Sequence, residues 1–383
     1  MSLRIGFLIS HPIQYYAPIF RELARRCDLD VFFAHKQTAS QQASAGFGVD
    51  FEWDVDLLSG YSSRFLANVA PTPSTDRFGG CNTPEIADAI SRGGYDAFVV
   101  PGWSLRSYWQ AVLACRRARV PVLVRGDSQL AGQRGGPMRL AKAALFPTLL
   151  RMFDGYLHVG KRNREYLQHY GAPSDRLFFS PACVDNAAFA AASRAVPASR
   201  GDGGRILFVG KLVGRKHPLD LVHAAARLAS KGRRVQLVFA GSGELAATLE
   251  AAARSKGVPA QFLGFVNQSR LPAVYAAADV IVLPSDGLET WGLAVNEAMA
   301  CGVPAVVSDM VGCGPDLVEP GRTGEVFPLG DVPALAEAIS RVLAFDRAAC
   351  RDRLAERMEI YSPKRAAEGI IEAANRLRLS GNR

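Results

Sequence analysis

Two carboxylates eight positions apart are the residues of this chain whose types and spacing most directly indicate chemistry. Glu289 and Glu297 lie on either side of a predicted helix start near Trp291, just after a predicted strand at 280–285. A helix turns by about 100° and rises by about 1.5 Å per residue, so Glu297 shares a face with Leu293 and lies about 6 Å further along it.

The predicted helix start suits a diphosphate. The backbone N–H groups near Gly292 and Leu293 have no partner inside the helix, and they lie at the positive end of the helix dipole. Glu297 is then positioned to accept hydrogen bonds from the hydroxyls of an attached ribose, while Glu289 faces whatever the distal phosphate carries. These residues predict a binding site for a nucleotide-sugar donor.

A basic cluster lies before another predicted helix of the same half of the chain. Lys211, Arg215 and Lys216 follow within six positions of the strand that ends at Gly210. A solvated basic loop would be the simpler interpretation of this cluster alone. The nearby pair of glutamates favours a phosphate site instead.

The sequence also resembles a known family. The stretch ETWGLAVNEAMACGVPAVVSD, from Glu289 to Asp309, and the later GCGPDLVEPGRTGEVF resemble the donor-binding half of family 4 glycosyltransferases, most densely from Arg205 to about Pro328. The resemblance implies the GT-B fold, an α/β fold of two Rossmann-like, doubly wound domains that face a central cleft. It also implies sugar transfer from a nucleotide donor with retention of the anomeric configuration. The alternative, a buried alanine-rich helix with two incidental glutamates, leaves Gly292 and the basic cluster unexplained.

The resemblance assigns roles to the basic residues. Lys211 and Lys216 stand where the family has an arginine and a lysine on the donor diphosphate, and Arg215 could take over the first contact. His217 occupies a position where glycine is common. These charges and the helix amides would stabilise the departing diphosphate in place of a metal, so neither a metal nor a cofactor is expected.

The glutamates complete this site, with Glu297 holding the ribose and Glu289 orienting the transferred sugar. The candidate catalytic residues are Glu289, Lys216 and Lys211, and the candidate donor-binding residues are Gly210, Arg215, Trp291, Gly292, Leu293 and Glu297. No carboxylate presents itself as a covalent nucleophile, so the resemblance implies a same-face substitution assisted by the leaving phosphate. The family reads the nucleobase with backbone groups, which leaves UDP and GDP undistinguished; UDP is expected as the commoner donor.

The N-terminal half carries the acceptor-side candidates. His11, Gln14 and Tyr15 occupy the loop that is often glycine-rich in the family, and a helix cap with inward-packed aromatics is as well supported as a role in the cleft. Asp127 and Ser128 end another predicted strand, where relatives often have a histidine, and they are candidates for acceptor contact. The expected acceptor is a glycan or a lipid-linked precursor in polysaccharide biosynthesis.

Strand-like and helical patterns alternate along the whole chain, as in parallel sheets covered by helices. They predict an N-terminal acceptor-binding domain (1–186), a linker rich in Ala, Ser, Gly and Pro (187–204), a donor-binding domain (205–360) and a terminal helix (361–383) that the family folds back onto the N-terminal domain. Strands are predicted at 4–10, 29–34, 95–102, 121–126, 154–160, 176–181, 205–210, 234–241, 260–266, 279–285 and 304–309.

Composition limits the surroundings and partners. The seven cysteines are scattered, odd in number and without metal spacing, which indicates free thiols in a reducing compartment. The first apolar run is too short for a signal sequence, and no run approaches the ~20 residues of a membrane span. We therefore expect a cytoplasmic protein. The net charge of +9 suits phosphate ligands, an anionic membrane or nucleic acid.

Two short D-x-D matches, Asp28–Asp30 and Asp54–Asp56, are typical of metal-dependent transferases of another fold. Both lie in the N-terminal half, away from the donor residues, and so short a pattern arises by chance. Metal binding is not expected from them.

The segment 133–153 has Arg134, Arg139, Lys142 and Arg151 among apolar residues. An amphipathic helix lying on the anionic inner face of a membrane and a helix buried on the sheet remain equally supported.

Two other functions are weaker. A GT-B nucleotide-sugar epimerase would need acid–base carboxylates that the sequence does not offer. A nucleic-acid or membrane-binding module would need clustered basic residues, whereas those of this chain are dispersed outside the proposed phosphate site.

Overall fold

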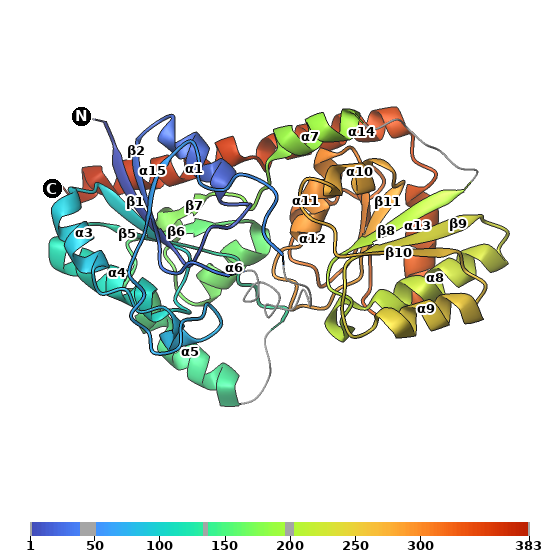
Figure 1. Ribbon diagram of the computed structural model, residues 1–383, viewed down its shortest axis with the longest axis horizontal. Coiled ribbons are helices and arrows are strands. Elements are labelled where there is room, and N and C mark those ends of the chain that lie inside the picture. Colours follow the sequence, from blue (N-terminus) through green and yellow to red (C-terminus); the bar gives the residue numbers. More distant parts are fainter. Residues whose placement is uncertain (1, 39–50, 133–136, 196–202, 382–383) are drawn as a thin grey trace.

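The computed structural model describes residues 2–38, 51–132, 137–195 and 203–381. The chain forms two α/β domains side by side, each built on one parallel β-sheet with helices on both faces (Figure 1). Within the described residues, the N-terminal sheet has seven strands in the order β3-β2-β1-β4-β5-β6-β7, and the C-terminal sheet has six in the order β10-β9-β8-β11-β12-β13. Two doubly wound α/β domains are therefore confirmed.

The strands are short, and those at the centre of each sheet are buried. The N-terminal sheet consists of β1 (Arg4–Ile9), β2 (Asp28–Phe33), β3 (Ser62–Phe65), β4 (Ala97–Val100), β5 (Val122–Gly126), β6 (Gly155–His158) and β7 (Leu177–Phe179). The C-terminal sheet consists of β8 (Gly204–Val209), β9 (Val235–Ala240), β10 (Ala260–Gly264), β11 (Val280–Leu283), β12 (Ala305–Ser308) and β13 (Gly324–Phe327).

Each predicted strand is present. The structure also has two strands that the sequence does not predict, β3 and β13. Both lie at a sheet edge. The four residues of β3, SSRF, are all exposed, so this strand lacks the continuous apolar run by which a buried parallel strand is recognised.

Helices of the N-terminal domain cover both faces of its sheet. On one face lie α3 (Ile86–Gly93), α4 (Arg106–Ala118), α5 (Pro137–Leu150) and α6 (Lys161–His169). On the other face lie α1 (Ala17–Ala24) and the final helix, α15 (Pro363–Gly381).

The C-terminal sheet is covered in the same way. One face carries α8 (Pro218–Ser230), α9 (Ala246–Ser255) and α13 (Val332–Val342), and the other carries α7 (Asn186–Arg194), α10 (Leu271–Ala276), α11 (Leu293–Ala300), α12 (Gly314–Leu317) and α14 (Arg347–Ile360).

The strand order of each sheet reverses at one point, between β1 and β4 in the N-terminal sheet and between β8 and β11 in the C-terminal sheet. Loops that leave the carboxyl ends of strands at such a point diverge and leave a crevice, which is where ligands bind in open α/β sheets. The loops after β1 and β4 therefore border the crevice of the N-terminal domain, and those after β8 and β11 border that of the C-terminal domain.

The predicted linker 187–204 differs from the structure in its first half. Residues 186–194 form α7, whose first turn is capped by the Asp185 carboxylate accepting the Ala188 N–H at 3.0 Å. Alanine favours helix, and Phe189 anchors α7 because it is buried among residues of the C-terminal domain. Residues 196–202 of the predicted linker lie outside the described residues.

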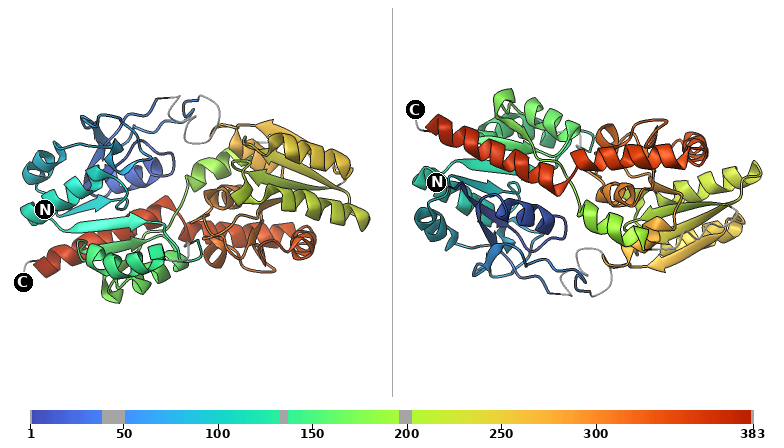
Figure 2. Two further views of the ribbon diagram at one scale, coloured as in Figure 1. Left: turned by 90° about the horizontal axis from the view of Figure 1, so that it is seen from below. Right: turned by 90° about the horizontal axis from the view of Figure 1, so that it is seen from above.

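Helix α15 returns to the N-terminal domain, along which it runs in Figure 2. Ala366, Ala367 and Ile370 are fully buried against that domain. Close approach requires a glycine, because a Cβ at Gly369 would lie 2.0 Å from the carbonyl oxygen of Phe179 in β7.

We therefore expect Gly369→Ala to lower the free energy of unfolding by about 1–3 kcal/mol, the usual cost of overpacking, although alanine normally stabilises a helix. Gly79→Ala is the matched control, because nothing lies within 4 Å of a Cβ there. Urea unfolding of both variants tests this, and a Gly369→Ala protein as stable as the wild type would contradict the close packing of α15.

Candidate active site

The start of α11 presents open backbone amides to the cleft. No side chain caps this helix, and Gly292 stands at its N-cap with φ of +106°. A Cβ at Gly292 would lie 2.7 Å from Cδ2 of Leu283. Both the backbone conformation and the space therefore require glycine. The Val295 N–H donates to the Gly292 carbonyl at 2.9 Å, which leaves the N–H groups of Leu293 and Ala294 for an anion.

Helix α11 begins at Leu293, two residues after the start predicted at Trp291. The Trp291 side chain is buried, and its Nε1 donates to Oδ1 of Asn296 at 2.7 Å. Its ring packs 5.9 Å from that of Tyr361, so Trp291 supports the helix start from beneath.

Glu297 lies on the second turn of α11 beside a cavity of about 300 Å³. Its carboxylate accepts the Tyr275 hydroxyl at 2.7 Å and the Gln268 amide at 3.3 Å. Burial raises the pKa of Glu297 to about 7, although these two hydrogen bonds oppose the shift. Leu293 lines the same cavity, as the helical spacing predicts, and the volume is at the lower end of those that hold small ligands.

The basic cluster meets the two-glutamate segment directly. Lys216 forms an ion pair with Glu289, and both side chains are mostly buried, at 11% and 15% exposure. A Cβ at Gly210 would lie 3.7 Å from Nζ of Lys216, so this glycine leaves the space beside the ammonium open. The structure thus brings two candidate catalytic residues, from the loops after β8 and β11, into contact.

The other residues of the cluster differ in their surroundings. Burial, followed by the nearby charges of Arg215 and Lys216, lowers the pKa of Lys211. Arg215 is exposed, and its carbonyl accepts the Asp286 N–H at 2.9 Å. His217 has φ of +48°, a left-handed conformation that explains why glycine would suit this position.

Among the acceptor-side candidates, Asp127 lines a cavity of the cleft. His11 and Ser128 line neither this cavity nor the one at Glu297. Tyr15 borders both the cavity at Glu297 and a second cavity of about 220 Å³, which Asp127 also lines. Nδ1 of His11 lies 2.9 Å from the Ser10 hydroxyl, and burial lowers the pKa of His11 to about 4, so this imidazole is neutral at pH 7.

Asp127 reaches across the cleft, where its carboxylate accepts the Thr290 hydroxyl at 2.7 Å. The carbonyl of Ser128 accepts the Asn163 amide at 2.9 Å, which ties Ser128 to α6 of its own domain.

Gln129 and Arg162 hold the two domains together, and the sequence does not predict this role. We call this pair the interdomain latch. The Gln129 amide nitrogen donates to the carbonyls of Gly287 (2.9 Å), Glu289 (3.0 Å) and Met310 (3.2 Å). Nη1 of Arg162 donates to Oε1 of Gln129 at 3.3 Å and to the Met310 carbonyl at 2.8 Å. The N-terminal domain thereby holds the backbone of the candidate catalytic residue Glu289.

The D-x-D match Asp54–Asp56 makes structural hydrogen bonds. Asp54 accepts the N–H of Ser269 at 3.0 Å across the domain boundary, and Asp56 accepts those of Leu58 at 3.0 Å and Ser59 at 3.2 Å. Over the described residues, no three His, Cys, Asp or Glu side chains gather in a way that could hold a metal ion. Metal-independent chemistry stays a prediction.

The basic segment 133–153 contains α5, but Arg134 and the side chain of Arg139 lie outside what the structure describes. Lys142 is not a free surface cation. Its ammonium lies 4.9 Å from the ring centres of Phe146 and Tyr166 and 5.4 Å from that of Tyr170. In the described part of the chain, no helix has the length and apolar character needed to cross a membrane.

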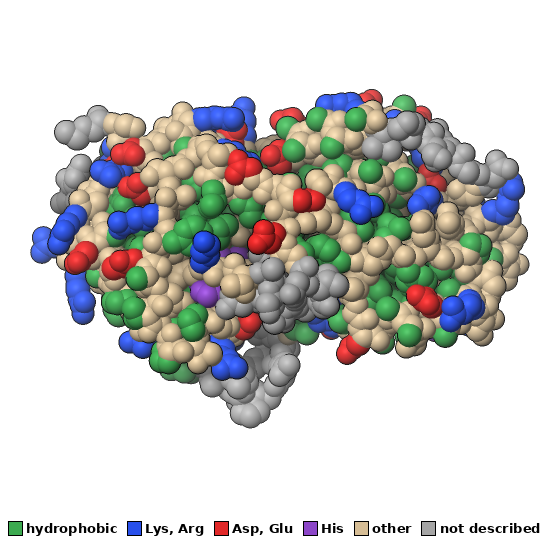
Figure 3. All heavy atoms as spheres, in the orientation of Figure 1, with side chains coloured by type: hydrophobic (Ala, Val, Ile, Leu, Met, Phe, Trp, Pro, Cys, Tyr) green, Lys and Arg blue, Asp and Glu red, His purple; other side chains and the backbone are tan. Residues whose placement is uncertain are grey.

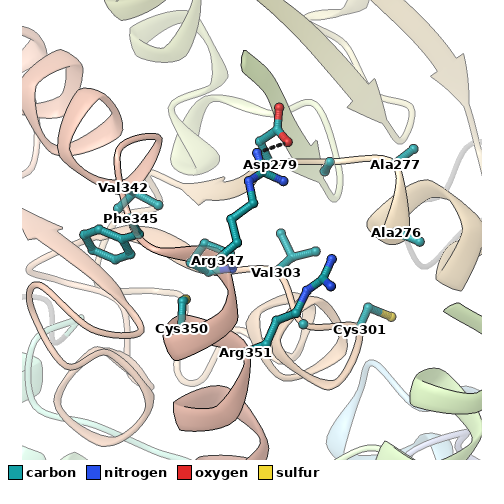
Figure 4. Close-up of a pocket in the computed structure, with 13 residues that line it drawn as sticks. Ala276, Ala277, Asp279, Cys301, Val303, Val342, Phe345, Arg347, Cys350 and Arg351 are labelled. Atoms are coloured by element: carbon teal, nitrogen blue, oxygen red, sulfur yellow. Dashed lines mark hydrogen bonds and ion pairs between the residues drawn. The ribbon is translucent and has the colours of Figure 1, made fainter. Parts of the chain in front are cut away.

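Two other parts of the surface do not offer a comparable binding site. A hollow of about 50 Å³ lies at Asp279, Cys301 and Arg347 and is too small for a nucleotide. Figure 4 shows the side chains that line it. On the face shown in Figure 3, Lys and Arg side chains are scattered among acidic ones. That face has no continuous basic stripe of the kind that nucleic acids require.

Known proteins resemble this chain in both sequence and fold. Residues 190–365 match the family described as glycosyl transferases group 1. A D-inositol 3-phosphate glycosyltransferase from Geodermatophilus obscurus is 36% identical over 259 residues, which are 63% of this chain and 56% of that protein. An alpha-D-kanosaminyltransferase from Streptomyces kanamyceticus is 32% identical over 171 residues, 44% of this chain and 42% of that protein.

Solved structures match over nearly the whole chain. The lipopolysaccharide outer core galactosyltransferase WaaB has a TM-score of 0.69 at 16% identity, with 97% of this chain and 99% of that chain covered. The sucrose-phosphate synthase from Thermosynechococcus elongatus has a TM-score of 0.69 at 21% identity, with 99% and 100% covered.

These comparisons establish the fold and the resemblance. The chain has the GT-B fold, and its resemblance to family 4 glycosyltransferases is confirmed. The matched segments span 40% to 56% of the length of the kanosaminyltransferase and of two D-inositol 3-phosphate glycosyltransferases among the curated relatives.

The latch predicts a split between catalysis and nucleotide binding. Gln129→Ala removes the hydrogen bonds to the other domain and leaves the Gly287 carbonyl without this donor, at a cost of about 1–3 kcal/mol. The carbonyls of Glu289 and Met310 keep the Gly312 N–H and Arg162 as donors. We expect kcat for sugar transfer to fall by about 10- to 100-fold. The Kd of free UDP should stay the same, because Gln129 does not line the Glu297 cavity. Leu130→Ala, at the exposed next position, is the control, and an equal loss of UDP affinity would refute the latch.

The raised pKa of Glu297 predicts a pH-dependent affinity for nucleotides. The carboxyl is protonated below pH 7 and ionised above it, and the ionised form accepts hydrogen bonds from ribose hydroxyls more strongly. UDP binding should therefore tighten by up to about tenfold from pH 6 to pH 8.

Glu297→Gln should remove this part of the dependence, while any titration of the nucleotide itself remains in both proteins. Calorimetry at several pH values would measure the difference. Identical pH profiles would exclude Glu297 as the ribose contact.

Proposed function

We propose that this protein is a glycosyltransferase that moves a sugar from a nucleoside diphosphate sugar to an acceptor held by the N-terminal domain. The observation that carries the proposal is the Lys216–Glu289 ion pair. This pair joins the basic loop after β8 to the loop that leads into the uncapped start of α11.

In this proposal the C-terminal domain binds the donor. Glu297 and Leu293 border the cavity that receives the nucleoside, and the amides from Leu293 onward face the diphosphate. Lys216 then exchanges its carboxylate partner for phosphate oxygens. This exchange releases the Glu289 carboxylate to bind hydroxyls of the sugar.

Bond breaking builds negative charge on the departing diphosphate. Lys216, Lys211 and Arg215 supply fixed positive charge beside it, and the helix amides supply aligned dipoles. These groups take the role that a metal plays in other transferases, so we propose that transfer needs neither a metal nor another cofactor.

Retention of configuration follows in this proposal from the occupied carboxylates. Asp127 is bound to Thr290, and Glu289 is paired with Lys216 in the empty site and with hydroxyls of the sugar once the donor is bound, so neither stands free as a covalent nucleophile. The acceptor hydroxyl would attack on the face that the diphosphate leaves, with the leaving phosphate accepting its proton.

The donor is proposed to be UDP-linked. The structural neighbour HepE, with a TM-score of 0.65, was solved in complex with UDP and glucose, which supports a UDP sugar. A mannosyltransferase relative from Mycobacterium tuberculosis is GDP-mannose-dependent, so GDP is the comparison that a binding experiment must include.

The acceptor is proposed to be a glycan or a lipid-linked precursor in polysaccharide biosynthesis, used in the cytoplasm. Contact with the inner face of an anionic membrane is part of the same proposal. Lys142, held among three rings, is not the cation that would make it.

The proposal is tested at the leaving group. Lys216→Ala should lower kcat by about 10²–10³-fold, the usual loss on removing one preorganised donor of positive charge. Lys231→Ala, an exposed lysine of the same domain, should have no effect. Thermal shifts with UDP, GDP and their sugars would first identify the donor, and the matching sugar would then serve in the kinetic assay.

Transfer should also persist in excess EDTA. If EDTA abolished transfer, Mg²⁺ or Mn²⁺ restored it and Lys216→Ala stayed fully active, the proposed site would be wrong.

A further inference from the structure

We propose that the cavity of about 220 Å³ beside Asp127 binds an anionic group, a carboxylate or a phosphate of a sugar substrate, against the guanidinium of Arg125. The inference rests on the proposed function, because it describes the substrate that occupies the acceptor side of that site.

Arg125 is a buried cation with neutral partners. It lies on β5 and is 4% exposed. Its Nε donates to the Ser180 hydroxyl at 3.1 Å, and its Nη2 donates to the carbonyls of Ser180 at 3.3 Å and Pro181 at 2.8 Å. Its guanidinium carbon lies 5.1 Å from the ring centre of Tyr16. None of these groups carries a negative charge.

Tyr16, which also lines the cavity, is a further hydrogen-bond partner of Arg125, and this partner is neutral as well. Arg125 therefore brings a buried positive charge with only neutral partners to the wall of the cavity.

No carboxylate neutralises this charge within the described residues. Asp127 lines the same cavity, but it forms no ion pair with Arg125 and is instead bound to Thr290. Burying a cation without a counter-ion is costly, so an arginine is retained in such a place most readily where a ligand supplies the anion. A planar guanidinium also matches the oxygens of a carboxylate or phosphate better than an ammonium does.

The walls of the cavity suit a sugar ring that carries this anion. Tyr15, Tyr16, Tyr108 and Trp291 line it and give apolar faces with polar edges. The donor diphosphate already has partners at Lys216 and the start of α11. Leu293, at the start of α11, borders this cavity too, so the anion at Arg125 lies beside the diphosphate and belongs, in this proposal, to an acidic group of the acceptor or of the transferred sugar.

A structural role for Arg125 makes a different prediction. Ser180, its main partner, also donates to the Ala366 carbonyl at 3.0 Å, so Arg125 helps to fix the segment after β7 against helix α15. Ser180→Ala removes the hydroxyl that joins Arg125 to α15 and leaves the guanidinium itself in place. It is therefore the matched control for Arg125→Gln.

The experiment measures sugar binding to the full chain by calorimetry at low salt, with UDP saturating the donor site. Glucose 6-phosphate and glucuronate should bind at least about tenfold more tightly than glucose, a difference that an added charge-assisted hydrogen bond supports. Arg125→Gln should abolish this preference with an unchanged Kd for UDP, whereas Ser180→Ala should keep it. If Arg125→Gln does not fold, Arg125→Lys replaces it, with an expected loss of at least about tenfold in glucose 6-phosphate affinity.

A second arm distinguishes the source of the anion. Tighter binding of UDP-glucuronate than of UDP-glucose, lost in Arg125→Gln, would place the acid on the transferred sugar. A preference seen only with glucose 6-phosphate or glucuronate beside UDP would place it on the acceptor.

The proposal is overturned if acidic and neutral sugars bind equally in both arms, or if none binds. It is also overturned if Arg125→Gln weakens UDP itself and leaves the preference for acids intact. Failure of the proposed function would be visible separately, because the wild type would then bind neither UDP nor GDP.

Discussion

The ion pair between Lys216 and Glu289 joins the loops after β8 and β11, the neighbouring strands at which the order of the C-terminal sheet reverses. Because both side chains are mostly buried, removing either would leave an uncompensated charge, so the pair fixes both loops beside the start of α11. A diphosphate can replace Glu289 as the partner of Lys216. The same contact that orders the empty site is therefore the one that a donor would rearrange.

The position of Glu289 also depends on the other domain. Gln129 and Thr290 bring the loop after β5 against the loop before α11, and Gln129 donates to the Glu289 carbonyl itself. The far end of the cleft is joined by Asp54, which accepts the Ser269 N–H beside the Glu297 cavity. Domain contact and donor geometry are thus coupled through backbone hydrogen bonds, and any opening of the cleft must release the segment that carries Glu289.

These couplings explain what the sequence could and could not predict. Glu297, Gly292 and Lys216 are recognisable because a helix start and its spacing require particular residue types. Gln129 and Asp54 bond to backbone groups of the other domain, which leave no signature in the sequence. The sequence also does not predict helix α7, the exposed strand β3 or the ring contacts of Lys142, because tertiary packing decides them.

The two halves of the cleft recognise ligands by different physical means. Under the proposed function the donor side relies on helix amides and on glycines such as Gly292, and these lie within the family match at 190–365. The acceptor side relies on side chains. Tyr15 stands where a glycine-rich loop is common, borders both cavities, and shares the second with Arg125, which has no carboxylate partner. Side chains can change without disturbing the sheet beneath them, so under the proposed function this wall would set the choice of acceptor while the donor chemistry stays constant.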